Sequence, residues 1–427
     1  MLTNSQGKEL TLLLRQYREG DEEGMIACIR DEYGDTYFKR DFYDPAYLRE
    51  EIEEGIITVL VAQTQEDGIA GMLLLKQFYP EESMCEIASQ IFRKKYRGYG
   101  LALPFFEFAM ELLLSRTYSA AFCLPVLFHD VTQRLLYRLG LKATGLIMNV
   151  FDMEHIRHSY SNGKNSKHSQ GIQVRALEKV NAGRLYLPEE HRNFCEEIYN
   201  NLGVRYQMTG EKIGNISFPA HSVIIYKNNE LQHSLEIRII QVGADLAKHM
   251  KELHARYPLK DRQTANVFLN INDPWAIWAY RMLWQLGYFF TGLRPLCSER
   301  EFMVLHNCGQ MDVYFEDYVL SSEFACLVEY INTCYEEQKK AGERERKNGG
   351  KKEKDRTKGK QAAAVAGACD DAAGRRYQRL RTVFPEGNID GQQYDVRADR
   401  RRRHRAGSRR DGGGASSGDC GGESGLY

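Results

Sequence analysis

The segment Arg97-Gly98-Tyr99-Gly100-Leu101-Ala102 joins a predicted strand, Glu86 to Phe92, to a predicted helix, Leu101 to Ser115. Glycines at such a junction let the main chain turn sharply and approach a ligand closely. Consecutive main-chain N–H groups and the positive end of the following helix then face an anion, and three basic residues between positions 94 and 97 add positive charge. This pattern favours a diphosphate site, and the alternative is an ordinary glycine-rich turn. It is neither a Walker loop nor a dinucleotide-binding turn, because G-x-x-x-x-G-K and G-x-G-x-x-G are both absent.

Strand-like and helix-like patterns alternate on both sides of this segment over the first 150 residues. Asp44-Pro45 has the features of a helix start, and residues 65–68 those of a hairpin turn between two apolar strands. The predicted order of elements is β-α-α-β-β-β-α-β-α-β. This order predicts an α/β fold, more closely an α+β sandwich with a mixed sheet.

An internal repeat links this region to a later one. Residues 132–146 align with residues 279–293 at a constant offset of 147, and seven of the fifteen positions are identical, including Thr144-Gly145-Leu146 and Thr291-Gly292-Leu293. About one identity would arise by chance, so the domain is predicted to be duplicated.

The repeat and the composition divide the chain into four parts. We expect a first domain over residues 1–152, a polar linker over 153–171, a second domain over 172–335 and a disordered basic tail over 336–427. The tail holds 23 Lys and Arg against 15 Asp and Glu, whereas the first 335 residues hold 35 against 43. An acidic body of this kind is not drawn to nucleic acid by its charge.

The 427 residues are 43% hydrophobic and hold ten cysteines. No run approaches the ~18 apolar residues of a membrane helix, and charged residues interrupt the leucines near the N-terminus as they would not in a signal peptide. The cysteines stand singly, without any C-x-x-C pair, which is typical of reduced core packing. We therefore expect a cytoplasmic protein that does not bind a membrane.

The order of elements, the Arg97–Ala102 loop and the later segment Tyr137-Arg138-Leu139-Gly140-Leu141 resemble the GNAT acetyltransferase superfamily. The resemblance covers Leu10 to Phe151, and the second region resembles the C-terminal half of two-domain bacterial GNAT proteins. It implies a duplicated acyl-CoA N-acyltransferase sandwich that uses acetyl-CoA as co-substrate and no metal. The implied acetyl-CoA-binding residues, from the strand and from the loop, are Gln90, Ile91, Phe92, Arg97, Gly98, Tyr99, Gly100, Leu101 and Ala102.

The catalytic residues are less well defined by the resemblance. Many members carry a tyrosine four residues before the glycine of the Leu-Gly segment, as general acid toward the CoA thiolate, but Leu136 stands there. Tyr137 follows one residue later, about 100° around a helix, and is kept as a candidate acid or as a surface packing residue. A general base is required because an ammonium acceptor must lose a proton before it attacks. The candidates are Glu86, whose alternative is a solvated strand end, and His129, whose alternative is a helix cap.

The second region lacks the R-x-x-G-x-G/A pattern that Arg97 to Ala102 fit. Its best counterpart, Gln241-Val242-Gly243-Ala244-Asp245, has one glycine and no arginine, so we expect only the first domain to bind acetyl-CoA. The second domain is expected to shape the acceptor site or to pair two protomers as a homodimer. The predicted function is transfer of an acetyl group from acetyl-CoA to an amine of a small molecule or protein. The alternative is a non-catalytic acyl-CoA-binding regulatory or interaction protein.

Overall fold

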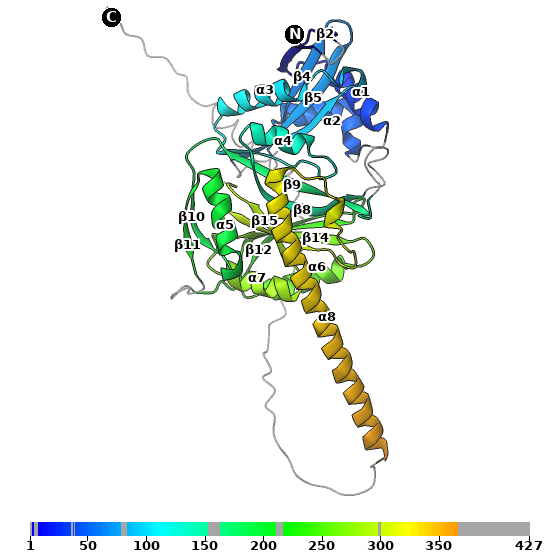
Figure 1. The fold of residues 1–427 in the computed structure, drawn as a ribbon, viewed down its shortest axis with the longest axis vertical. Coiled ribbons are helices and arrows are strands. Elements are labelled where there is room, and N and C mark those ends of the chain that lie inside the picture. Colours follow the sequence, from blue (N-terminus) through cyan, green and yellow to red (C-terminus); the bar gives the residue numbers. More distant parts are fainter. Residues whose placement is uncertain are drawn as a thin grey trace, which may run out of the picture. The chain divides into compact units, whose positions relative to one another are not determined.

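The computed structural model is a mixed α/β fold, as the sequence predicts (Figure 1). It describes residues 2, 3, 7–35, 37, 39–77, 83–152, 163–210, 217–297 and 300–365, with side chains up to residue 344. Its first half consists of β1 (Leu2–Thr3), β2 (Glu9–Leu10), β3 (Leu13–Gln16), α1 (Glu22–Tyr33), η1 (Arg40–Tyr43), α2 (Pro45–Glu53), β4 (Ile57–Thr64), β5 (Gly68–Lys76), β6 (Met84–Phe92), η2 (Lys94–Tyr96), α3 (Ala102–Leu114), β7 (Ala120–Cys123), α4 (Val131–Arg138), β8 (Lys142–Asp152) and β9 (Lys167–Ala176).

The second half follows the same style of alternation. It consists of β10 (Asn181–Tyr186), α5 (Glu189–Leu202), β11 (Arg205–Thr209), β12 (Val223–Asn229), β13 (Ser234–Gln241), α6 (Leu246–Arg256), β14 (Thr264–Asn270), α7 (Ala276–Gln285), β15 (Phe289–Arg294), β16 (Phe302–Asn307), η4 (Phe315–Asp317) and α8 (Ser322–Val365). Within the described residues, none of these helices is long and apolar enough to cross a membrane.

Local sequence explains several of these boundaries. Asp44 caps α2, since its side chain accepts a hydrogen bond from the main-chain N–H of Ala46 at 2.9 Å and Pro45 occupies the first turn. The apolar strands β4 and β5 pair from Ile57–Lys76 to Thr64–Gly68, which confirms the predicted hairpin. Both features are therefore determined by residues close together in the chain.

Twelve strands form one mixed sheet in the order β12-β13-β14-β16-β15-β8-β9-β7-β6-β5-β4-β3. The order β5-β6-β7-β9-β8 in the first half matches the order β12-β13-β14-β16-β15 in the second. In each half a helix, α3 or α6, connects two parallel strands. The repeat seen in the sequence thus corresponds to a repeated strand topology.

The two halves meet where β8 crosses β15. Gly145 pairs with Gly292, its counterpart at the offset of 147. The hydroxyl of Thr144 donates to the carbonyl of Leu293 at 3.0 Å, and that of Thr291 donates to the carbonyl of Leu146 at 3.0 Å. Equivalent residues thus exchange equivalent bonds, which is the pattern of a two-fold symmetric interface.

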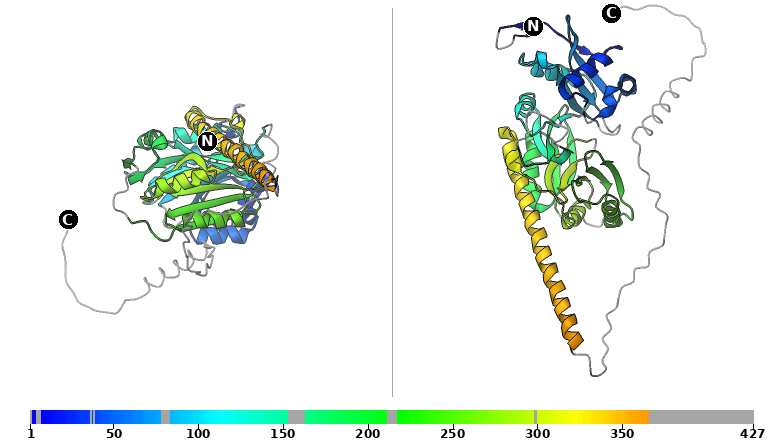
Figure 2. Two further views of the ribbon diagram at one scale, coloured as in Figure 1. Left: turned by 90° about the horizontal axis from the view of Figure 1, so that it is seen from below. Right: turned by 90° about the vertical axis from the view of Figure 1, so that its right-hand side faces the viewer.

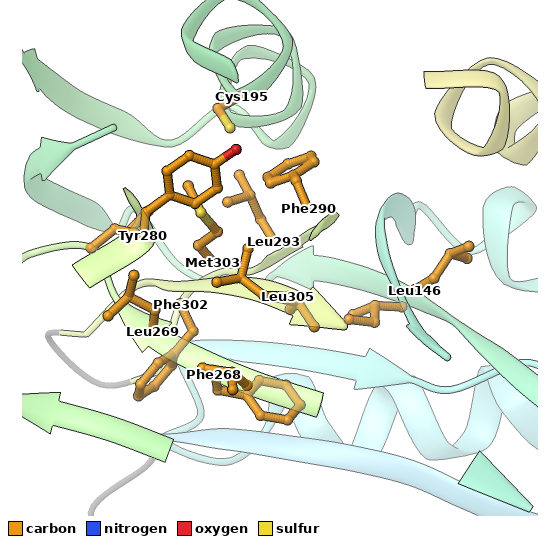
Figure 3. Packing of buried hydrophobic residues seen from close by; sticks show 14 of the residues in the cluster. Leu146, Cys195, Phe268, Leu269, Tyr280, Phe290, Leu293, Phe302, Met303 and Leu305 are labelled. Carbon is orange, nitrogen blue, oxygen red and sulfur yellow. The ribbon is translucent and has the colours of Figure 1, made fainter. Parts of the chain in front are cut away.

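A side chain at this crossing would collide with the facing strand. A Cβ added to Gly292 would lie 2.2 Å from the Cα of Gly145. A large buried apolar cluster contains residues from both sides of the crossing. Figure 3 shows part of it, including Leu146 of β8, Leu293 of β15 and Leu305 of β16. The halves therefore share one sheet and one of its apolar clusters.

Two elements of the structure extend across the expected boundaries. β9 begins at Lys167, inside the expected linker 153–171, and it completes the first half by pairing with both β7 and β8. The buried Lys167 ammonium donates to the carbonyl of His233 at 2.9 Å and to the hydroxyl of Thr264 at 3.0 Å, which is how a polar segment can enter a sheet. Residues 153–162 lie outside the described part, and the division into two domains stays a prediction.

The second element is α8, which runs on through residues 336–365 of the tail that is expected to be disordered. Its first turns lie against β8 and β15 (Figure 2), with Phe324, Leu327 and Ile331 buried. These three residues are three and four positions apart, so they lie on one face of α8 and pack its start against the sheet. The Glu, Lys and Arg that follow are good helix formers. Residues 366–427 lie outside the described part of the chain.

Candidate functional site

Strands β6 and β7 separate soon after they meet. Their parallel pairing covers three residue pairs, from Met84–Ala120 to Glu86–Phe122, although β6 continues to Phe92. On its other side β6 stays paired with β5, apart from a bulge between Ala88 and Ile91 that contains Ser89 at a φ of 49°. From Ile87 onward, the main-chain groups of β6 that point toward β7 are therefore outside that ladder and available to a ligand.

The loop after β6 leaves its main-chain donors unused. No hydrogen bond found in the described residues is donated by the main-chain N–H of the five residues from Gly98 to Ala102. Gly98 and Gly100 have φ values of 84° and 71°, and a Cβ added to either would meet no atom within 4 Å. No side chain of a described residue caps the N-terminus of α3. The loop is thus an open set of N–H donors at a positive helix end, which suits an anion.

Buried side chains hold this loop in place. Tyr96, Tyr99 and Leu101 pack with Ala70 of β5 in a small apolar cluster. The amide of Gln90 donates to the carbonyl of Ala102 at 3.3 Å, which ties β6 to the start of α3. Some of the predicted acetyl-CoA-binding residues therefore hold the loop in place with their side chains, and others present main-chain N–H groups.

Two further predicted residues pack beside the loop. Ile91 is buried on the side of the sheet that faces α1, and the Phe92 ring lies 5.5 Å from that of Phe105 in α3. A Cβ at Gly71 of β5 would collide with the Phe92 ring at 2.3 Å, so glycine makes room for it. Both side chains serve packing, which leaves their main chain as the part that can reach a ligand.

Acidic residues balance the positive charge around the loop. Arg97 forms an ion pair with Glu32, and Lys95 forms one with Asp67. The main-chain N–H of Lys94 donates to the Asp31 carboxylate at 2.5 Å. Because about half of the Arg97 side chain is exposed, its ion pair is screened by solvent and can be exchanged for one with a phosphate.

Glu86 lies at the point where β6 and β7 separate. Its side chain is buried, with 7% exposed, and its Oε2 has no hydrogen-bond partner among the described residues. Lys76 stands directly opposite in the β5–β6 ladder and is also buried. Burial, and to a smaller extent the nearby Lys39 ammonium, lower the pKa of Lys76 to about 7, while the Glu86 carboxylate opposes the shift. A buried carboxylate oxygen without a partner can accept a proton from a substrate.

The other two catalytic candidates lie elsewhere. His129 belongs to the loop after β7, where its ring lies 5.2 Å from that of Phe128, and burial lowers its pKa. Tyr137 is 38% exposed, with the Lys142 ammonium 4.2 Å from its ring centroid. Leu136, its neighbour, is fully buried against the α3 side of the sheet. Among the described residues, no hydrogen bond, ion pair or ring contact joins Glu86 to His129 or Tyr137.

Three polar residues near Glu86 were missed by the sequence analysis. Besides Lys76, the hydroxyl of the buried Tyr37 lies 3.3 Å from that of Ser89 at the bulge. Only Lys76 gives a signal in the sequence, as a lysine that directly follows Leu73-Leu74-Leu75 in a buried strand. Within the described residues, no group of His, Cys, Asp and Glu could hold a metal ion.

The equivalent turn of the second half is filled by the chain itself. The N–H of Val242 donates to the Asp273 carboxylate at 2.8 Å, that of Gly243 to the Ser222 hydroxyl at 3.0 Å, and that of Ala244 to the Pro219 carbonyl at 2.8 Å. A Cβ at Gly243 would lie 2.3 Å from the main chain of His221. Three successive main-chain donors of this turn are thus satisfied by the chain itself, whereas the donors of the turn in the first half stay open.

No protein-family model and no curated protein matches the chain. Among solved structures, an N-acetyltransferase from Staphylococcus aureus is 12% identical, with a TM-score of 0.33, and the match covers 39% of this chain and 99% of that one. A spermidine/spermine N-acetyltransferase from Vibrio cholerae is 13% identical, with a TM-score of 0.32, over 39% of this chain and 92% of that one.

Proposed function

We propose that the first half of the chain is an N-acetyltransferase that uses acetyl-CoA and an amine. The observation that carries the proposal is the open loop from Gly98 to Ala102, with its unused N–H donors, beside the free edge of β6. A diphosphate fits the loop, and an extended pantetheine arm fits a strand edge that lacks a partner. Both features come together only in this half of the described chain.

The chain's own residues then have separate tasks. Acetyl-CoA supplies an activated thioester when it is bound. The loop N–H groups hold the diphosphate, and the edge of β6 from Ile87 to Phe92 orients the arm. Glu86 takes a proton from the ammonium acceptor, directly or through water, so that the neutral nitrogen can attack the thioester carbonyl. The carbon–sulfur bond breaks, and the second proton of the nitrogen goes to the departing thiolate.

Whether a residue can help to protonate the CoA thiolate distinguishes an acetyltransferase from a non-catalytic acyl-CoA-binding protein. Leu136 is buried where an acid is expected, and Tyr137 is partly exposed beneath Lys142. This arrangement favours the second candidate function, an acyl-CoA-binding protein without catalysis. His129 and Tyr137 stay predictions as catalytic residues, to be tested by His129→Ala and Tyr137→Phe.

Two measurements test the proposal. Calorimetry should show one acetyl-CoA bound per chain, and a thiol-reactive dye should report CoA release when amines are added. Binding without release from any amine would leave the non-catalytic function, and no binding would end both. Two bound molecules per chain would show that the second half also has a site.

Glu86→Gln should lower kcat at pH 7 by at least about 100-fold, within the range of general acid–base catalysis, and leave acetyl-CoA affinity unchanged. Glu107→Gln, at an exposed position of α3, is the matched control and should change neither quantity. An unchanged kcat in Glu86→Gln would remove Glu86 as the base.

A further inference from the structure

The strand β12 ends the sheet on the side of the second half, and its outer edge is open. In the described part of the chain it pairs with β13 alone, and no other main-chain hydrogen bond reaches that edge. The strand begins with Val223-Ile224-Ile225-Tyr226, of which Val223 is 47% exposed and the other three are partly exposed. It holds one charged residue, Lys227, and no proline, so it has few of the features that keep an edge strand from pairing.

The first half shows what fits on an edge at this place. In the repeated strand order β12 corresponds to β5, and the outer edge of β5 is covered by β4, which pairs with it antiparallel along its whole length. The described part of the second half has no counterpart of β4. The repeat therefore indicates a place for one antiparallel strand beside β12.

The hydrogen bonds of β13 determine which groups of β12 point outward. The carbonyl of His233 accepts a hydrogen bond from the N–H of Thr264 at 3.0 Å, so alternate residues of β13, counted from His233, bond to β14. The residues between them, counted from Ser234, bond to β12, where Ser234 faces Asn229. The main-chain groups of β12 that point away from β13 are therefore those of Ile224, Tyr226 and Asn228.

We propose that the open edge of β12 pairs with the same edge of a second copy of this chain, antiparallel and about a two-fold axis at Tyr226. The two twelve-stranded sheets then continue into each other. This inference does not depend on acetyl transfer, and it names the surface by which two protomers associate.

An axis at Tyr226 gives the register with the most hydrogen bonds. Tyr226 faces its own counterpart, and Ile224 faces Asn228 of the second copy. All of these residues point their main-chain groups outward, so each facing pair exchanges two hydrogen bonds. An axis one residue away along the strand leaves fewer facing pairs of this kind.

The side chains of β12 are complementary in this register. Lys227 faces Ile225 of the second copy, which packs against the apolar stem of the lysine, so the two ammonium groups are not opposite each other. The two Tyr226 rings face each other, and aromatic pairs of this kind stabilise antiparallel strands. An axis at Lys227 would instead set two like charges directly opposite. One surface thus covers both open edges, as in an isologous dimer.

The test is the mass of the full-length chain in solution, measured by sedimentation equilibrium over a range of concentrations. We expect a reversible monomer–dimer equilibrium in the micromolar range, because a single pair of strands is a small interface. A chain that stays monomeric at about 100 µM would overturn the inference. Assemblies that grow beyond a dimer would also overturn it, since open growth requires two different surfaces.

A proline on the outer edge tests the surface itself. Ile224→Pro removes an N–H that points outward and leaves the hydrogen bonds to β13 in place. By symmetry the dimer loses two hydrogen bonds and the ring clashes with the facing strand, so the dissociation constant should rise at least about 100-fold. Ile224→Ala is the matched control, because it shortens the same side chain and keeps the N–H, and it should stay within about tenfold of the wild type.

Circular dichroism and thermal unfolding show whether these variants fold. If Ile224→Pro does not, Asn228→Pro and Asn228→Ala give the same comparison at the other facing position, where the lost N–H again points outward. Dimers that persist in a folded proline variant would show that the chains associate through another surface, and the inference would be wrong.

Discussion

The two strand-to-helix connections of the repeat occupy equivalent places and differ in what their main-chain donors do. Between β6 and α3, the N–H groups from Gly98 to Ala102 have no partner in the described part of the chain, whereas between β13 and α6 the N–H groups from Val242 to Ala244 all bond to the chain itself. The strands differ in the same sense, because β6 and β7 pair over three residues and β13 and β14 over six. A repeated topology therefore does not repeat the candidate site. That site is defined by the set of donors and the strand edge that the described part of the chain leaves unpaired.

The largest expected effect is the loss of acetyl-CoA binding in Gly100→Glu. The added carboxylate would lie where the diphosphate is expected, and it would oppose the ligand both sterically and by charge. We expect the affinity to fall by at least about 1,000-fold, which corresponds to ~4 kcal/mol. Calorimetry on the purified variant measures this directly.

Gly203→Glu is the matched control for that variant. Gly203, at the end of α5, has a φ of 66° and no atom within 4 Å of an added Cβ, as Gly100 has a φ of 71° and equal space. The two variants therefore introduce the same side chain with similar main-chain strain. Both should lose similar stability, but only Gly100→Glu should lose binding. Equal binding in the two variants would show that the open loop is not the site.

The sequence predicted those features of the fold that depend on nearby residues. The identities at an offset of 147, such as Thr144 with Thr291, indicated the duplication. The structure adds that the hydroxyls of these two residues donate to equivalent carbonyls of the opposite half, those of Leu293 and Leu146. β9 was missed because the partners that satisfy Lys167, the carbonyl of His233 and the hydroxyl of Thr264, lie 66 and 97 residues away. Partners that are distant in sequence leave no local pattern.

The same limit applies to the candidate site. The motif at positions 97–102 and the strand before it predicted the loop and Glu86, because both lie on one continuous segment. The sequence did not show that the ammonium groups of Lys39 and Lys76 each lie 5.2 Å from the centroid of the Phe42 ring, since they meet only when η1 packs against the sheet. For the second turn, the missing arginine and glycine predicted that it does not bind acetyl-CoA, but the occupation of its donors by Ser222 and Pro219 could not be read from the motif.

A smaller effect separates the two equivalent glycines, Gly100 and Gly243. A Cβ at Gly243 would lie 2.3 Å from the carbonyl carbon of His221 and 2.6 Å from its oxygen, so Gly243→Ala must displace the main chain. We expect a loss of about 3 kcal/mol in the free energy of unfolding, whereas Gly100→Ala adds only the strain of a positive φ, about 1 to 2 kcal/mol. Urea unfolding of both variants checks the difference. Equal losses would mean that the second turn has as much free space as the first.

The smallest expected effect concerns Asp245, at the start of α6. Its carboxylate accepts hydrogen bonds from the main-chain N–H of Ser222 at 2.7 Å and from the His221 ring at 3.0 Å. Burial alone would raise the pKa of Asp245, but these hydrogen bonds outweigh burial and lower the pKa below its usual value of 3.8. Asp245→Asn should cost about 1 kcal/mol at pH 7, the usual worth of such a bond.

The sign of the pH dependence follows from the lowered pKa of Asp245. The stabilisation is present above pH 3.8, the usual pKa of an aspartate, and is lost as the pH falls through the lowered value of the folded state. The difference in unfolding free energy between the wild type and Asp245→Asn should therefore shrink below that pH. Asp261→Asn, at an exposed position, is the control for the loss of a surface carboxylate. Asp245→Asn also tests how the second turn is closed. If Ser222 and Pro219 occupy its donors, removal of one charge should still leave a single acetyl-CoA per chain; a second bound molecule in Asp245→Asn would show that charge alone had kept the ligand out.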